Sequence, residues 1–183
     1  MKKHFNTAGP CQPDIHYMLS SVERMPHIKS LIDQRNYFVI HAPRQVGKTT
    51  AMLTLAQELT ASGEYTALMV SVEVGSAFPD QPEIAEKAIL GAWAKNARFW
   101  LPKELHPPAI PEAEAGQRIN ATLSLWAEVS PRPFVLFIDE IDSLQNQTLI
   151  SVLRQLRDGF PNRPKGFPQS LGLVGMRDVR DYK

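Results

Sequence analysis

Positions 42–49 read Ala-Pro-Arg-Gln-Val-Gly-Lys-Thr, which departs from the phosphate-binding pattern G-x-x-x-x-G-K-[ST] only at its first residue. That pattern works through backbone N–H groups that wrap a phosphate, a lysine that reaches the terminal phosphates, and a hydroxyl that binds Mg²⁺. Gly47 supplies the unhindered turn, Lys48 the cation and Thr49 the hydroxyl, while Ala42 is the smallest departure from glycine. The predicted nucleotide-binding residues are Ala42, Pro43, Arg44, Gln45, Val46, Gly47, Lys48, Thr49 and Thr50.

A second chemical signal follows an apolar run. Residues 134–138 read Phe-Val-Leu-Phe-Ile, and Asp139 and Glu140 come directly after them. In a parallel sheet, the carboxyl ends of the strands form the edge where ligands bind. We therefore predict that Asp139 holds Mg²⁺ together with Thr49, directly or through water, because Mg²⁺ favours one or two carboxylates plus phosphate oxygens. Glu140 is the candidate general base for a water that attacks the γ-phosphate. The alternative is that both acids only solvate the end of a strand.

The elements that must position these residues are indicated by hydrophobic spacing. Residues 37–40 form a short apolar run before the loop, and residues 49–63 repeat apolar side chains at helical spacing after it. Strand, loop and helix in this order place a helix N-terminus against the phosphates. Further helices are expected at 20–36, 80–100, 117–129 and 147–159. Strands are expected at 37–42, 66–72, 134–138 and 171–176.

This alternation of strands and helices predicts an α/β fold, in which a parallel sheet carries helices on both faces. Asp80 is expected to cap the helix that begins near it. The helix at 147–159 is expected to turn Leu149, Ile150, Leu153 and Leu156 inward.

Composition limits the possible classes of protein. The chain has 183 residues, of which 43% are hydrophobic and 21% charged, with a formal net charge of +1. That size suits one α/β domain, and the charge gives no support to a nucleic-acid role. Cys11 is the only cysteine, so no internal disulfide forms, and neither a signal peptide nor a membrane span is recognisable. We therefore expect a cytoplasmic protein with no membrane contact.

The pairing of PRQVGKTT with FIDEID resembles the AAA-like group of phosphate-loop ATPases, in particular its bacterial and archaeal branch close to the STAND-type ATPases. The resemblance implies a three-layer fold with strand order 5-1-4-3-2, so that strand 171–176 lies between strands 37–42 and 134–138. It implies ATP and Mg²⁺ as ligands, with ATP hydrolysis as the ancestral activity. It also implies that Arg177, after the fourth strand, senses the γ-phosphate. The alternative is that Arg177 only pairs with a nearby aspartate.

The chain departs from this group after the fourth strand, where relatives continue with a fifth strand, an arginine finger and a helical lid. We expect an N-terminal arm and helix at 1–35 and a truncated ATPase core at 36–183. Strand 37–42 would then be a sheet edge at which two copies could associate. Activity could be lost by truncation. Two alternatives stay open: a module that binds ATP but barely hydrolyses it, and an ATPase subunit of a nucleic-acid system.

Overall fold

The computed structural model describes residues 4–5, 15–17, 26–41 and 47–175. Four strands and five helices of at least two turns alternate within this part of the chain. The strands are β1 (Tyr37–His41), β2 (Thr66–Ser71), β3 (Phe134–Asp139) and β4 (Ser170–Gly175). The helices are α2 (Pro26–Asp33), α3 (Lys48–Ala61), α4 (Pro82–Trp100), α5 (Arg118–Val129) and α6 (Asn146–Asp158). The predicted α/β alternation is confirmed, and each strand agrees with its prediction to within one residue at either end.

The four strands form one parallel sheet in the order β1-β4-β3-β2. This confirms the order that the family resemblance implied, with β4 between β1 and β3. Gly172 makes the central place of β4 possible, because a Cβ there would lie 2.8 Å from ring atoms of both Phe137 and Phe38. β1 pairs with β4 on one side and, among the described residues, with no strand on the other. Self-association through this edge stays a prediction.

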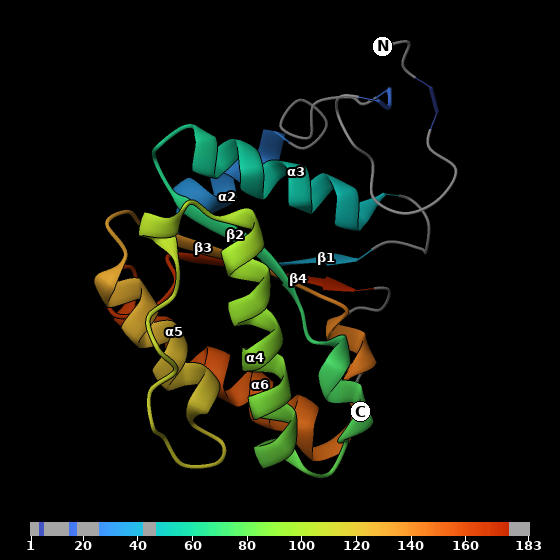
Figure 1. Ribbon diagram of the computed structural model, residues 1–183, viewed down its shortest axis with the longest axis vertical. Coiled ribbons are helices and arrows are strands. Elements are labelled where there is room, and N and C mark those ends of the chain that lie inside the picture. The colour runs from blue at the N-terminus through green and yellow to red at the C-terminus, as the bar shows by residue number, and fades with distance from the viewer. Residues whose placement is uncertain (1–3, 6–14, 18–25, 42–46, 176–183) are drawn as a thin grey trace.

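Helices cover the sheet on both faces (Figure 1): α2 and α3 lie on one face, and α4, α5 and α6 on the other. Because side chains alternate along a strand, each strand contributes to both layers. In β3, Val135 and Phe137 pack beneath α3, whereas Leu136 and Ile138 pack toward α4 and α6. All six residues of β3 are buried, which explains why its sequence is apolar up to Asp139.

Two local predictions were wrong. α4 begins at Pro82 with Gln81 as its N-cap residue, and Asp80 instead accepts a hydrogen bond from Asn146 Nδ2 at 3.1 Å. The fixed φ of proline suits the first turn of a helix, so the helix starts without a side-chain cap. Ile150 is 45% exposed, and Gln155 is buried in its helix instead. The reason is a polar network that joins Gln155 to Glu86 of α4 and to the N-terminus of α5.

Membrane insertion through a helix finds no support in this part of the chain. Among the described residues, no helix is both long and apolar enough to span a bilayer.

Candidate functional site

The N-terminus of α3 lies at the carboxyl edge of the sheet, directly after the predicted phosphate loop. Gly47 is the N-cap residue and adopts φ 83° and ψ 20°, a left-handed conformation that glycine reaches without the Cβ clash of other residues. The N–H of Ala51 donates to the carbonyl of Gly47 at 2.9 Å and closes the first helical turn. Gly47 is therefore required by the backbone, as the motif predicts.

The described structure covers only part of the predicted loop. Gly47, Lys48, Thr49 and Thr50 are described, and the last three form the first turn of α3. The other predicted loop residues lie outside the described residues, namely Ala42, Pro43, Arg44, Gln45 and Val46. Arg177 also lies outside them.

The first turn of α3 carries no internal anion. Its N-cap residue is a glycine, which has no side-chain acceptor, and the first turn contains no acidic residue. The first N–H groups of a helix have no partner within the helix, and the helix dipole gives this end a partial positive charge. Such an end binds phosphates and carboxylates well. The arrangement is therefore suited to an anion brought from outside the helix.

A hydrogen bond between Thr49 and Asp139 joins this helix end to the tip of β3. Thr49 Oγ1 donates to Asp139 Oδ2 at 2.8 Å, between residues that are 90 positions apart in the sequence. Asp139 is only 7% exposed, and its other carboxylate oxygen accepts the N–H of Glu140 at 3.0 Å. The carbonyl of Asp139 accepts the N–H of Val72 at 3.2 Å, at the tip of the neighbouring strand β2. The structure thus brings Thr49 and Asp139 together, and the two strand tips hold the aspartate in place.

Glu140 has an unusual backbone conformation. Its φ is 57°, in the left-handed region that residues other than glycine rarely occupy. Its carbonyl accepts the N–H of Ser143 at 2.9 Å, which starts the short 3-10 helix η3 (Ile141–Ser143). Strained residues of this kind persist where the surroundings hold them, and they are concentrated at functional sites. The sequence indicates Glu140 as a candidate site residue, but no sequence pattern predicts its left-handed backbone conformation.

The tip of β4 completes this edge of the sheet. Gly175 is opposite His41 in the register of β4 and β1, so both strands end at the same edge of the sheet. A Cβ on Gly175 would lie 2.9 Å from Asp142 Oδ1, which shows that β4 packs tightly against the turn after β3. Sequence reasoning did not identify this requirement for glycine, because the contact joins residues far apart in the chain.

The oxygen atoms at this site fit Mg²⁺. Thr49 supplies a hydroxyl and Asp139 a carboxylate, and Mg²⁺ binds few protein oxygens while taking the rest of its ligands from phosphates and water. The described residues contain no group of three or more His, Cys, Asp or Glu side chains that could hold a metal ion. The chemistry of the site therefore suits a cation that arrives with a phosphate ligand, rather than one held in an all-protein cage.

Comparison with known proteins bears on the same region. The family model described as "ATPase family associated with various cellular activities (AAA)" matches residues 38–170. This match begins in β1 and ends at the start of β4, and it includes both Thr49 and Asp139. Comparison with curated proteins finds none that matches the chain.

Proposed function

The chain belongs to the AAA family of ATPases, and from this premise we propose that it binds ATP with Mg²⁺ at the N-terminus of α3 and hydrolyses it. The observation that carries the proposal is the 2.8 Å hydrogen bond between Thr49 and Asp139. It brings the predicted hydroxyl and carboxylate ligands of Mg²⁺ to one point, beside a helix end that contains no anion of its own.

Each residue has a distinct proposed role. The N–H groups of residues 42–50 and the ammonium of Lys48 hold the β- and γ-phosphates of ATP. Thr49 and Asp139 hold Mg²⁺, which supplies positive charge against the phosphate oxygens. Glu140 accepts a proton from the attacking water and orients it. Arg177, outside the described residues, would contact the γ-phosphate through its planar guanidinium.

Two other functions remain as alternatives: nucleotide binding with almost no hydrolysis, and an ATPase that acts on nucleic acid. The net charge of +1 gives the second no support. A phosphate-release assay with MgATP, run with and without DNA, separates the three. Release that DNA does not change supports the proposed function. Binding without release favours the first alternative, and release that requires DNA favours the second. Membership of the STAND-type branch stays a prediction.

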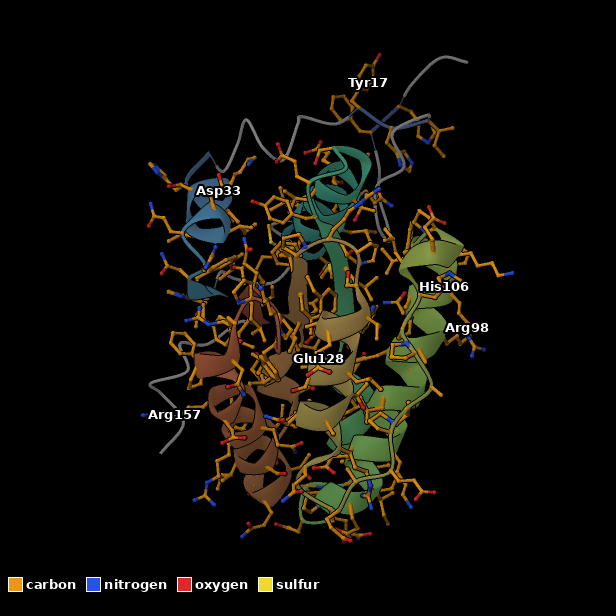
Figure 2. The ribbon with its side chains drawn as sticks, turned by 90° about the vertical axis from the view of Figure 1, so that its left-hand side faces the viewer. Tyr17, Asp33, Arg98, His106, Glu128 and Arg157 are labelled. Atoms are coloured by element: carbon orange, nitrogen blue, oxygen red, sulfur yellow. The ribbon has the colours of Figure 1, made fainter. Side chains whose placement is uncertain are left out.

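One pair of variants in the same assay tests whether Glu140 is the general base. Glu140→Gln should retain nucleotide binding and slow phosphate release by about 10²–10⁴-fold, since it removes the proton acceptor. Glu128→Gln makes the same change on the exposed surface of α5 (Figure 2) and should release phosphate at the wild-type rate. Equal rates for the two variants would show that Glu140 is not the base.

A further inference from the structure

A groove of about 650 Å³ lies between α4 and the carboxyl end of β2. Its apolar lining includes Val74, Ala92, Trp93 and Phe99. Trp93 is 2% exposed and belongs to the core, whereas Phe99 is 76% exposed and stacks edge-to-face with Trp100 at a centroid distance of 4.8 Å. Because most of its ring is exposed to water, Phe99 is a candidate contact for another molecule.

The backbone carbonyls along the edge of β2 beside this groove already accept hydrogen bonds from side chains. Asn96 Nδ2 donates to the carbonyl of Met69 at 2.8 Å, and Trp93 Nε1 donates to the carbonyl of Ser71 at 2.9 Å. Nearer the start of the strand, Thr60 Oγ1 bonds to both the N–H and the carbonyl of Ala67 at 3.0 Å. An added β-strand would need these carbonyls. A molecule in the groove must therefore bind through side chains, as an amphipathic helix does.

The outer face of α4 next to the groove is cationic. Lys87, Lys95 and Arg98 are exposed and recur at helical spacing, and none of them forms an ion pair with another described residue. Arg98 projects outward from the helix in Figure 2. Glu73 is the acidic residue that lines the groove. The charge of this face is thus complementary to carboxylates on a partner.

Gly91 adds an observation of a different kind. It is exposed in the interior of α4, on the same face as Lys87 and Lys95, and a Cβ there would meet no atom within 4 Å. Glycine weakens a helix interior relative to alanine, and no described residue uses the space that its missing side chain leaves. A second helix crossing at this point would use that space, because glycine permits close approach of another backbone.

We propose that the groove and the outer face of α4 dock an acidic amphipathic helix of a protein partner. Its apolar side chains pack against Val74, Ala92 and Phe99, and its carboxylates face Lys95 and Arg98. The apolar lining distinguishes this surface from one built for nucleic acid, in which phosphate contacts dominate. The proposal does not depend on nucleotide binding at α3.

The binding test uses fluorescence anisotropy with the full chain and a labelled synthetic peptide. The peptide is an amphipathic helix with glutamates on one face and leucines on the other, and a matched peptide carries lysines in place of the glutamates. We expect saturable binding of the acidic peptide, with the lysine peptide at least about tenfold weaker. Labelled single-stranded DNA is the third probe. Failure of the acidic peptide to saturate, equal binding of both peptides, or tighter binding of DNA would each overturn the proposal.

Variants then locate the binding surface. The double variant Lys95→Glu with Arg98→Glu should weaken binding of the acidic peptide about tenfold, since it replaces attraction by repulsion. Arg157→Glu with Lys165→Glu makes the same charge change at exposed positions elsewhere and should stay within about twofold of wild type. Phe99→Ser should also weaken binding, and it leaves the fold intact because Phe99 is so exposed. Circular dichroism checks helix content in each variant. Equal affinities for the two double variants, or unchanged binding by Phe99→Ser, would contradict the proposed surface.

Discussion

The N-termini of α3 and α5 both follow a glycine with positive φ, but they differ in the side chains that surround them. α3 follows Gly47 and α5 follows Gly116 closely, and the two glycines have φ values of 83° and 82°. At α5, both oxygens of the Glu86 carboxylate accept the N–H of Gly116, at 3.0 and 3.1 Å. Gln155 Oε1 accepts the N–H groups that follow in the first turn, those of Ile119 and Asn120. At α3, the first turn has neither a capping side chain on its N-cap residue nor an acid.

This contrast supports the place that we propose for an external anion. The N-terminus of α5 is satisfied by Glu86 and Gln155, which come from α4 and α6 and bond to each other at 2.6 Å. Glu86 is 0% exposed, so this network ties three helices together and serves the fold. The N-terminus of α3 has Lys48 and Thr49 instead, at the edge of the sheet. The carboxylate that reaches this turn, that of Asp139, accepts the hydroxyl of Thr49 at 2.8 Å. Among the described residues, the first turn of α3 has no acid of its own, and it is therefore the helix end that we propose for an external anion.

Removing the internal anion should have the largest effect on stability. Glu86→Ala removes the acceptor of the partly buried Gly116 N–H and the 2.6 Å acceptor of the buried Gln155 amide, which also donates to Ser151 Oγ. It should lower the free energy of unfolding by about 3 kcal/mol. Nucleotide affinity should be unchanged, because α3 does not contact this network. Urea denaturation measures the first quantity and calorimetric titration the second.

Glu83→Ala is the matched control, because Glu83 is exposed one turn earlier on the same helix. Its effect should stay within about 0.5 kcal/mol. Equal losses for the two variants would mean that the carboxylate of Glu86 is not what closes the N-terminus of α5.

Removing the cation at the open N-terminus should produce the reverse pattern. Lys48→Ala should lower nucleotide affinity at least about tenfold, because several charge-assisted hydrogen bonds are lost. Its free energy of unfolding without nucleotide should change by less than about 0.5 kcal/mol. Unchanged affinity in a calorimetric titration would refute the role of Lys48, and a large loss of stability would make it a structural residue.

The two glycines permit a sharper comparison. Alanine at either position forces a side chain into the left-handed conformation and should cost about 1 kcal/mol of stability. A Cβ on Gly47 would meet no atom within 4 Å, so this cost comes from the backbone alone. Only Gly47→Ala should also weaken nucleotide binding. If Gly116→Ala weakened it as much, the two helix ends would not be independent.

A small effect is expected from an exposed cluster far from both helix ends. Asp33 is desolvated by burial, but hydrogen bonds from Tyr65 at 2.6 Å and Lys29 at 3.1 Å outweigh this and hold its pKa below the usual value. A lowered pKa in the folded state stabilises the protein above the unfolded pKa, and this contribution disappears as the pH falls through the folded pKa. Because Asp33 is largely exposed, we expect about 0.5 kcal/mol.

Urea denaturation of wild type and Asp33→Asn at neutral and acidic pH measures this effect. The wild type should be more stable at pH 7, and the difference should vanish at a pH below the folded pKa of Asp33. A difference that grows as the pH falls would show that the sign of the linkage is wrong.

Sequence reasoning recovered the features that depend on short patterns. The apolar run before Asp139 predicted a buried strand, and the glycine of the loop predicted the turn at Gly47, since each is determined within a few residues. The strand order came from the resemblance to a family. The proximity of Thr49 and Asp139 followed from placing both at the carboxyl edge of a parallel sheet.

The features that were missed depend on contacts between distant parts of the chain. Gln155 is polar yet buried, because its amide joins Glu86 and the N-terminus of α5 across separations of 36 and 69 residues. Hydrophobic periodicity assigns such a residue to the surface, and it placed Ile150 inward instead. Asp80 fits a capping pattern, but its bond to Asn146 on α6 decides its position.

We propose above all that the N-terminus of α3 binds MgATP, and that only the folded protein binds it. Urea denaturation with MgATP at about 100 times its dissociation constant should raise the free energy of unfolding by about 2.7 kcal/mol. At the same MgATP concentration the gain should fall to about 1.4 kcal/mol or less in Lys48→Ala, as a loss of affinity of tenfold or more requires, and it should stay at about 2.7 kcal/mol in Arg157→Glu. No gain for the wild type at any MgATP concentration, or an equal gain in Lys48→Ala, would contradict the assignment of this site.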